Sequence, residues 1–460
     1  MGDASCITKV VDIVRTAARE AHVAVVVSAM SGVTNRLLDA AKQAEEGDLA
    51  SVAATLGEIR TRHEAAASSL VRSIAARRRL IATIWELLQQ AERSCERVSR
   101  RRKLTLRDLD AVLGLGERLS APVLAASLVE RGVASVAVDA TELVVTNGRH
   151  GAARPNVRLT FERCEARLRP LLSQGLVPVV TGFIGATQSG VPTTLGRNSS
   201  DYSGALMGAA LNADEVTLWT DVDGVLTADP KLVPDARPIL EMSYREASDL
   251  AAIGAKVLHT KTLIPVMGRG IPLVIRNTFA PDRHGTRITV DGSARRAAVR
   301  AISAQTGLSL ITIQASSVRQ AAAISHRVAK ALRSDMRVLL PSQACRSEVS
   351  VVVPTSRAGF ALEKLFRELA RDFRPRKVHH VALSPRVCIV TVVGCGLDLG
   401  SAPRDRIFRA LDRENLEVFA SGADASDSYL HFVVASEGMR SAVAAIHREF
   451  DWEFSSNGSQ

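Results

Sequence analysis

The stretch Leu176–Tyr202, LVPVVTGFIGATQSGVPTTLGRNSSDY, gives the clearest indication of the fold. It opens with a short apolar run, Val177–Thr181, that suits a buried strand. A loop rich in glycine, serine and threonine follows, and a helix is expected from about residue 200. A buried strand that leads through a polar loop into a helix is typical of α/β proteins.

The same alternation of strand and helix extends across residues 1–290. Further strands are predicted at Val23–Val27, Val216–Trp219 and Pro272–Ile275, and helices at about 34–47, 116–131, 200–212 and 244–253. This alternation predicts an α/β fold with a doubly wound, mostly parallel sheet. Residues 48–104 differ, because they are rich in Ala, Leu and Arg and lack Pro, so they predict a helical excursion from the sheet domain.

After Gly285 the pattern changes to two similar units of short strands and helices. The first has strands at Leu308–Ile313, Val338–Leu340 and Val349–Val353, with helices at about 317–333 and 358–371. The second has strands at Val387–Val393, Val418–Ala420 and Leu430–Val434, with helices at about 403–414 and 438–449. Two such units in succession predict a tandem pair of small α+β modules.

Composition restricts the class of protein. The chain of 460 residues is 46% hydrophobic and 23% charged, which is ordinary for a globular protein and excludes a disordered chain. The longest apolar runs, such as Leu176–Ile184, are far shorter than the roughly 20 residues of a membrane-spanning helix. The first residues carry no apolar secretory signal, and the six cysteines are scattered without metal-binding spacing. We therefore expect a cytoplasmic protein with reduced thiols and no membrane partner.

The net charge favours anionic ligands. Lys and Arg number 59 and Asp and Glu number 48, so the net charge is 59 − 48 = +11. Two basic clusters, 77–79 and 100–103, lie in the predicted helical excursion. They have no interleaved aromatic residues, and only 4% of the chain is aromatic. A solvated helix face is therefore favoured over a nucleic-acid interface, and no nucleic-acid partner is expected.

The start of the helix near residue 200 is a candidate site for an anion. The first N–H groups of a helix have no partner within the helix and carry partial positive charge, so they bind carboxylates or phosphates. Arg197, just before the helix, has a planar guanidinium that matches a carboxylate. Asp201 could cap the helix or accept hydrogen bonds from an ammonium group. The alternative to an anion-binding site is an ordinary capped helix that follows a polar loop.

A second candidate site follows the strand Val216–Trp219. The chain turns at Asp223-Gly224, and ligands of α/β sheets bind beyond the ends of such strands. Lys231 and Lys256 could supply positive charge to phosphates, although an isolated lysine is more often a surface residue.

Six motifs taken together resemble those of the aspartate kinases, and they occur in the order seen in that family. They are Val27–Asn35 (VSAMSGVTN), Gly114–Ser120 (GLGERLS), Gly182–Gly185 (GFIG), Thr194–Tyr202, Trp219–Lys231 and Gly254–His259. The chain is similar to monofunctional members over nearly its whole length. The resemblance implies an amino-acid-kinase domain over 1–290, followed by two ACT domains of ferredoxin-like fold at 300–375 and 386–452.

The resemblance also implies an activity, the ATP-dependent phosphorylation of L-aspartate to 4-phospho-L-aspartate, the first step of the aspartate-family amino-acid pathway. By matching motif positions, the aspartate-binding residues are Thr34, Glu117, Arg197, Ser200 and Asp201. The expected catalytic residues are Arg197, Asp201 and Lys256. The expected nucleotide-binding residues are Thr220, Asp221, Leu226, Lys231 and Lys256. The cofactor is ATP with Mg²⁺ carried by its phosphates, without direct protein ligands to the metal.

The sequence departs from the family most clearly at its start. Aspartate kinases open with a strand and a Lys-Phe-Gly-Gly-Thr-Ser-Val loop, whose lysine stabilises the transferring phosphoryl group. This segment is absent before the helix that starts near Ile7, so we expect the natural start to lie upstream of Met1. If it does not, a catalytically impaired protein with a regulatory or amino-acid-binding role is the alternative. Smaller departures are Leu226 in place of an aromatic residue and Thr260 in place of proline.

The two C-terminal modules imply feedback regulation. In this family, pairs of ACT domains bind an end-product amino acid such as lysine or threonine, often at a dimer interface, so a homodimer or homotetramer is expected. The candidate effector contacts are Gly394, Gly396, Asp424 and Ser426. The glycines at 394–400 also suggest a dinucleotide fingerprint, but their spacing is wrong and too little chain follows. A kinase acting on another acid is a further alternative, which Glu117 and Arg197 disfavour.

Overall fold

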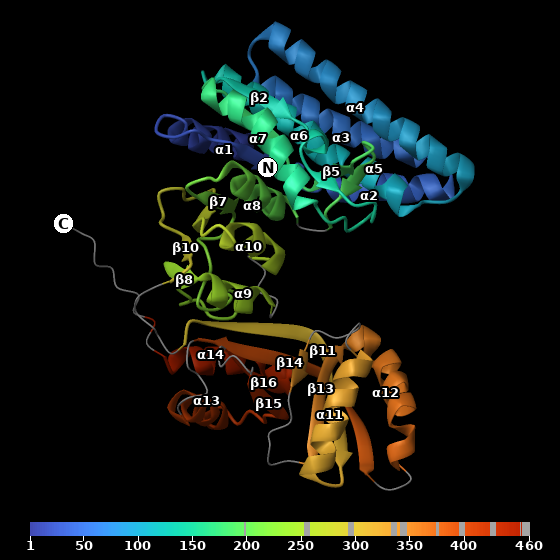
Figure 1. Cartoon of the computed structure of the whole chain (residues 1–460), viewed down its shortest axis with the longest axis vertical. Helices are drawn as coiled ribbons and strands as arrows, with labels where there is room; N and C mark the ends of the chain where they lie inside the picture. The colour runs from blue at the N-terminus through green and yellow to red at the C-terminus, as the bar shows by residue number, and fades with distance from the viewer. Residues whose placement is uncertain are drawn as a thin grey trace, which may run out of the picture. The chain divides into compact units, whose positions relative to one another are not determined.

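The computed structural model describes residues 1–196, 199–252, 258–292, 299–332, 338–340, 347–373, 377–394, 401–423, 429–450 and 452 (Figure 1). The chain forms two compact units. The first comprises Met1–Asp221 and Lys261–Arg283, and the second comprises Val222–Thr260 and His284–Gln460.

The first unit is an α/β structure with mostly parallel strand pairs. Its helices are α1 (Ala4–Ala17), α2 (Val33–Glu46), α3 (Leu49–Leu70), α4 (Ile74–Arg101), α5 (Leu106–Leu113), α6 (Leu115–Glu130), α7 (Val157–Ser173), α8 (Ser200–Leu211) and α10 (Thr260–Met267). Its strands are β1 (Val25–Val27), β2 (Ser135–Val138), β3 (Val145–Thr146), β4 (Val177–Thr181), β5 (Ile184–Thr187), β6 (Pro192–Thr194), β7 (Val216–Thr220) and β9 (Leu273–Asn277).

The strands of this unit run in parallel where the candidate site is expected. β4 lies between β1 and β2 and is parallel to both, with Val27 opposite Thr181 and Val138 opposite Val180. β7 and β9 form a second parallel pair, and β3, β5 and β6 form a small mixed sheet. The strands and helices that the sequence predicted in this region are therefore confirmed, with boundaries that differ by a few residues.

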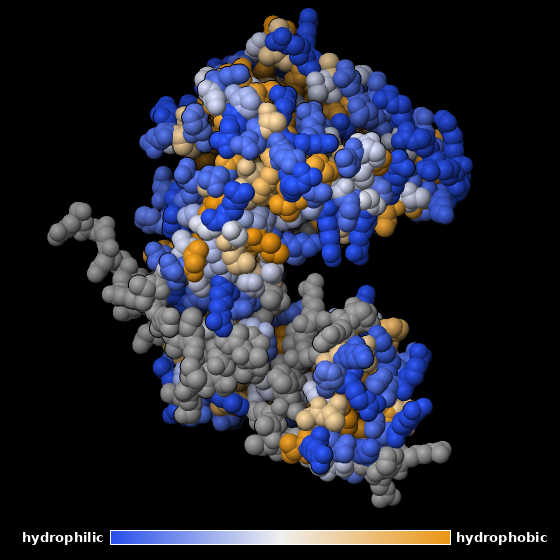
Figure 2. Space-filling model, in the orientation of Figure 1, coloured by the Kyte–Doolittle hydropathy of each residue, from blue (hydrophilic) through white to orange (hydrophobic). Residues whose placement is uncertain are grey.

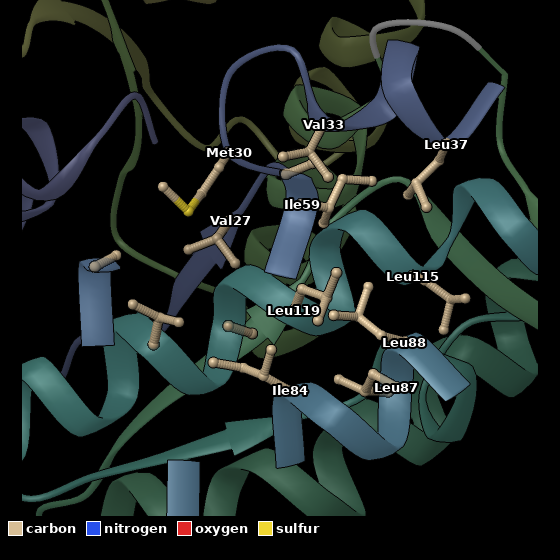
Figure 3. Close-up of a cluster of buried hydrophobic side chains, with 14 of the residues drawn as sticks. Val27, Met30, Val33, Leu37, Ile59, Ile84, Leu87, Leu88, Leu115 and Leu119 are labelled. Carbon is tan, nitrogen blue, oxygen red and sulfur yellow. The ribbon is translucent and has the colours of Figure 1, made fainter. Parts of the chain in front are cut away.

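The long helices α3 and α4 occupy the region where the sequence predicted a helical excursion. Figure 3 shows Ile84, Leu87 and Leu88 of α4 facing Leu115 and Leu119 of α6. Because these side chains are nearly inaccessible to solvent, α4 is part of the main core of the unit. The surface along α4 is mainly hydrophilic (Figure 2), and Arg78, Arg79 and the 100–103 cluster are exposed.

Within the part of the chain that the structure describes, one helical stretch is long and apolar enough to cross a membrane by length and composition alone. It is Leu106–Glu130, which contains α5 and α6, and 72% of its most apolar window is buried inside the protein. Burial of this kind is typical of a core helix.

The second unit contains a six-stranded antiparallel sheet with the strand order β12-β13-β11-β14-β16-β15. Its elements are β8 (Glu241–Ser243), α9 (Tyr244–Ala252), β10 (Thr286–Thr289), β11 (Ala301–Ala315), α11 (Val318–Leu332), β12 (Val338–Leu340), β13 (Glu348–Pro354), α12 (Ala358–Phe373), β14 (Val378–Val393), α13 (Ser401–Arg413), β15 (Ala420–Ala423), β16 (Tyr429–Ala435) and α14 (Met439–Arg448).

The helices predicted in the two C-terminal modules are present, and so are the strands, except that the strand predicted at Val418–Ala420 lies at Ala420–Ala423. β11 and β14 are longer than expected. Ala301–Gln305 pairs with Ile389–Val393, and after an irregularity the strands pair again from Leu308 onward. The first part of β11 thus lies beside the strand of the second module, and the remainder lies beside β13 of the first. The two modules share one continuous sheet for this reason.

Candidate functional site

The carboxyl ends of β1 and β4 lie side by side, and the start of α8 packs against them. Gly182, directly after β4, donates its N–H to the Val27 carbonyl over 2.8 Å. A Cβ atom added at Gly182 would lie 2.9 Å from the Ser200 Cβ and 2.9 Å from the Val27 carbonyl oxygen. Only glycine lets the first turn of α8 approach the two strand ends this closely.

Replacing Gly182 by alanine is expected to displace the start of α8. Overpacking of this kind lowers the free energy of unfolding by about 1–3 kcal/mol. A shift of the site by about 1 Å lowers kcat/KM by roughly 10-fold to 100-fold. Denaturant unfolding and steady-state kinetics measure the two effects. Gly204→Ala in the same helix is the matched control, because a Cβ atom there would meet nothing within 4 Å. Equal behaviour of the two variants would contradict this assignment.

Glu117, in the first turn of α6, is the most unusual polar residue at this edge of the sheet. Its side chain is only 3% exposed. One carboxylate oxygen accepts a hydrogen bond from the Ala29 N–H over 3.1 Å, and the other is buried without a partner among the described residues. A buried carboxylate oxygen with no donor is costly, so an oxygen in this state suits a ligand that brings its own N–H groups.

The start of α6 is fixed against the loop after β1. A Cβ atom added at Gly116 would lie 2.8 Å from the Ala29 Cβ, and the Ser120 hydroxyl donates to the Ser28 carbonyl over 2.7 Å. These contacts hold Glu117 at the carboxyl end of β1. The arrangement therefore presents one free carboxylate oxygen in a desolvated position, which favours binding of an ammonium group.

Burial raises the pKa of Glu117 to about 7. Only the ionised carboxylate pairs with a cation, so kcat/KM for an amino-acid substrate is expected to rise as the pH increases through about 7 and then to level off. A kinetic pH profile from about pH 5.5 to 8.5 measures this, and Glu117→Gln should abolish the rise. A rise that persists unchanged in the variant would assign it to another group.

The loop after β1 leads into the free start of α2. Gly32 takes a positive φ of 79° before the helix, and no side chain among the described residues caps α2. Thr34 lies half-buried in its first turn. The Ser31 N–H donates to the Met1 carbonyl over 2.8 Å, so α1 begins beside this loop.

The start of α8 is a second uncapped helix terminus at the same edge of the sheet. The Ser199 hydroxyl donates to the Gly196 carbonyl over 2.6 Å, and the described residues provide no side-chain cap for the helix. Asp201 lies in the first turn with part of its side chain exposed, and the protein packed around its carboxyl group raises its pKa by desolvation. Free helix N-termini attract anions, so α2 and α8 suit carboxylate or phosphate groups. Arg197, the predicted carboxylate ligand, is outside the described residues.

A buried network that the sequence did not indicate anchors the chain before Arg197. Asp110 of α5 is only 1% exposed and accepts hydrogen bonds from the His150 ring over 2.8 Å, from the Gly151 N–H over 3.0 Å and from the Thr194 hydroxyl. Thr194 ends β6, two residues before Gly196. An acidic residue on the buried face of an amphipathic helix was the signal that could have found Asp110.

The expected nucleotide-binding residues are distributed over both units. Thr220 and Asp221 follow the end of β7, where the Thr220 hydroxyl donates to the Asp221 carboxylate over 3.2 Å. Leu226 and Lys231 belong to the second unit, and the Lys231 side chain is exposed. Lys256 is outside the described residues.

Of the four expected effector contacts, the structure describes only Gly394. Gly394 is buried directly after β14, while Gly396, Asp424 and Ser426 are outside the described residues. Within the ranges that the structure describes, no three His, Cys, Asp or Glu side chains are grouped so that they could hold a metal ion.

Comparison with known proteins gives consistent matches. The model of the amino acid kinase family matches residues 1–277. The chain is 30% identical over 346 residues to lysine-sensitive aspartokinase 3 of Escherichia coli, covering 74% of each protein. It spans less than half the length of several relatives, such as the bifunctional aspartokinase/homoserine dehydrogenase of Haemophilus influenzae, of which 41% is covered at 30% identity.

Two solved structures of an aspartokinase are similar in fold to nearly the whole chain. The structure of E. coli aspartokinase III in complex with aspartate and ADP, described as an R-state, superposes with a TM-score of 0.78 at 27% identity and covers 98% of both chains. The complex of that enzyme with lysine and aspartate, described as a T-state, gives a TM-score of 0.75 at 26% identity and covers 97% of this chain and 98% of that one.

Proposed function

Because the chain belongs to the amino acid kinase family, and within it to the aspartokinases, we propose that it phosphorylates the side-chain carboxylate of L-aspartate with ATP, giving 4-phospho-L-aspartate. The observation that carries this proposal is the buried oxygen of Glu117, which has no partner among the described residues. It lies at a sheet edge where α2 and α8 begin without a side-chain cap from those residues. An amino acid with two carboxylates offers one ammonium group and two anions to such a site.

Each expected residue has a definite role in this proposal. Glu117 binds the α-ammonium group of aspartate, and Arg197 binds a carboxylate through its planar guanidinium. Thr34 and Ser200 donate hydrogen bonds from the first turns of α2 and α8. Asp201 orients the reacting groups at the start of α8. The aspartate carboxylate is itself the nucleophile, so the chain needs no general base.

The nucleotide would lie beyond the end of β7. Thr220, Asp221 and Leu226 would contact it, while Lys231 and Lys256 would neutralise phosphate charge. The uncapped start of α8 fits a phosphate group for the same electrostatic reason. ATP supplies the phosphoryl group, and Mg²⁺ bound to its phosphates lowers their negative charge. Catalysis then consists mainly of positioning the two substrates and stabilising charge.

We propose the domain limits 1–290 for the kinase domain and 300–375 and 386–452 for two ACT modules of ferredoxin-like fold. The six-stranded antiparallel sheet supports this division, since each half carries two helices of its own. Lysine or threonine would bind to these modules and regulate the kinase, and a homodimer or homotetramer would form through them. The complex of E. coli aspartokinase III with lysine supports lysine as the effector. A cytoplasmic location accords with this biosynthetic role.

A substrate panel tests the proposed activity. ADP release is measured with L-aspartate, L-glutamate, N-acetyl-L-aspartate and D-aspartate. We expect release with L-aspartate alone at an appreciable rate, because N-acetylation removes the ammonium group that Glu117 would bind and glutamate is one methylene longer. Equal rates with N-acetyl-L-aspartate and L-aspartate would refute the role of Glu117, and release with none of the four acids would refute the activity.

A further inference from the structure

The 225–239 segment, which contains the expected nucleotide-binding residues Leu226 and Lys231, folds within the second unit. It is a closed loop, because the Ile239 N–H donates to the Val225 carbonyl over 2.8 Å and the Thr227 N–H donates to the Arg237 carbonyl over 2.9 Å. At its tip, the Lys231 N–H donates to the Asp229 carboxylate over 3.0 Å, forming a turn around Pro230.

The last helix of the chain, α14, holds this segment at two points. The Thr227 hydroxyl and the His447 ring nitrogen Nε2 lie 3.0 Å apart in a buried hydrogen bond. The Arg440 guanidinium donates to the Lys231 carbonyl over 2.6 Å. Arg440 and His447 are two helical turns apart, so they lie on the same face of α14. This face is directed at the 225–239 segment.

Apolar packing supports the same contact. Ala228 and Val233 belong to one buried cluster with Val443 and Ile446 of α14. On the other side, the Ile302 N–H of β11 donates to the Thr227 carbonyl over 2.7 Å. The segment is thus attached to both the sheet and the last helix of the regulatory region.

The His447 ring is itself held in place. It stacks on Trp452 with the ring centroids 4.5 Å apart and the planes 15° apart. The Trp452 indole N–H donates to the His447 carbonyl over 2.6 Å. Such support fixes the orientation of Nε2 toward Thr227.

We propose that Arg440 and His447 are positioning residues for ATP, which act by holding the 225–239 segment so that Lys231 is presented to the nucleotide. This inference rests on the proposed function, in which Lys231 contacts the phosphates. The long lysine side chain is flexible, so its average position depends on how firmly the main chain beneath it is held. A ligand that moved α14 on the sheet would change ATP affinity by the same route.

Two variants test the inference, Arg440→Ala and His447→Phe. We expect the KM for ATP to rise about 5-fold to 20-fold, while the KM for aspartate stays within about twofold, because the expected aspartate-binding residues are not in this segment. Hydrogen exchange of peptides from 225–239 should become faster in both variants. Arg440→Lys, which keeps a donor for the Lys231 carbonyl, and His447→Gln, which keeps a polar group near Thr227, should restore part of the affinity.

The matched control is Arg448→Ala, on the same helix. Arg448 pairs with Glu414 over 2.7 Å and makes none of these contacts with the segment, so the KM for ATP should stay unchanged. Arg440 is exposed, so its variant should fold even where His447→Phe does not. An unchanged KM for ATP in Arg440→Ala would overturn the inference, as would an equal rise in Arg448→Ala.

Failure of the proposed function is distinguishable from failure of this inference. If the unsubstituted protein does not phosphorylate aspartate, the proposed function fails, and calorimetric titration with ADP then decides the inference. Weaker ADP binding by Arg440→Ala than by the unsubstituted protein would still support it. Equal dissociation constants, or no ADP binding by the unsubstituted protein, would overturn it.

Discussion

Replacing Glu117 by glutamine is expected to lower kcat/KM for aspartate by about 10²-fold to 10³-fold. Breaking a buried pair of opposite charges costs about 2–5 kcal/mol, and each 1.36 kcal/mol is a factor of ten in rate. One carboxylate oxygen of Glu117 lies in such a buried position and has no hydrogen-bond partner in the part of the chain that the structure describes. The effect should fall mainly on aspartate, and the KM for ATP should change little.

The same variant is expected to be more stable than the unsubstituted protein at pH 8. Burial raises the pKa of Glu117 to about 7 in the folded state, above its ordinary value of 4.5. The folded protein therefore binds the proton more tightly, and ionisation of this group costs stability as the pH rises from about 4.5 to 7. Glutamine avoids that cost, so its advantage should be about 1–3 kcal/mol at pH 8 and should vanish near pH 4.

Steady-state kinetics and denaturant unfolding at the two pH values measure these effects. Glu142→Gln is the matched control, because Glu142 is exposed and its pair with Arg167 spans 3.6 Å at the surface. This control should change kcat/KM less than twofold. Retention of full activity by Glu117→Gln would contradict the assigned role, and so would a loss of stability at pH 8.

Replacing Arg197 by alanine is also expected to lower kcat/KM for aspartate strongly. A guanidinium that binds a carboxylate through two charge-assisted hydrogen bonds contributes about 3–4 kcal/mol, which is roughly 10²-fold to 10³-fold in kcat/KM. The KM for aspartate should rise most. Arg197→Lys should recover only part of the loss, because an ammonium group cannot form the paired hydrogen bonds.

Arg154→Ala is the control for this prediction, since Arg154 is an exposed arginine in the loop between β3 and α7. It should retain kcat and both KM values within about twofold. If Arg197→Ala left the KM for aspartate unchanged, the carboxylate of the substrate would have to be bound by other residues.

The local structure of the kinase region could be predicted from the sequence because its signals are local. The run Val177–Thr181 forms β4, and the polar loop after it leads into α8 as expected. Glu117 was identified only through the family motif GLGE. Its burial and its unpaired oxygen depend on Ala29 and Ser28, which lie about 90 residues earlier in the chain, and no local pattern indicates such contacts.

Contacts between residues far apart in the chain could not be predicted from the sequence. The two C-terminal modules were predicted as separate units, because nothing in Ala301–Gln305 indicates that it pairs with Ile389–Val393. The attachment of the 225–239 segment to α14 was missed for the same reason, since Thr227 and His447 are 220 residues apart. Asp110 was missed because its hydrogen-bond donors come from distant loops.

Trapping the reaction product tests the proposed phosphorylation of aspartate. The purified chain is incubated with L-aspartate, ATP, Mg²⁺ and hydroxylamine, which converts an acyl phosphate into a stable hydroxamate. We expect the hydroxamate of the aspartate side chain, identified by mass spectrometry, and its near-complete loss in Glu117→Gln. Formation of no aspartate hydroxamate, or the same amount in the Glu117 variant, would contradict this expectation.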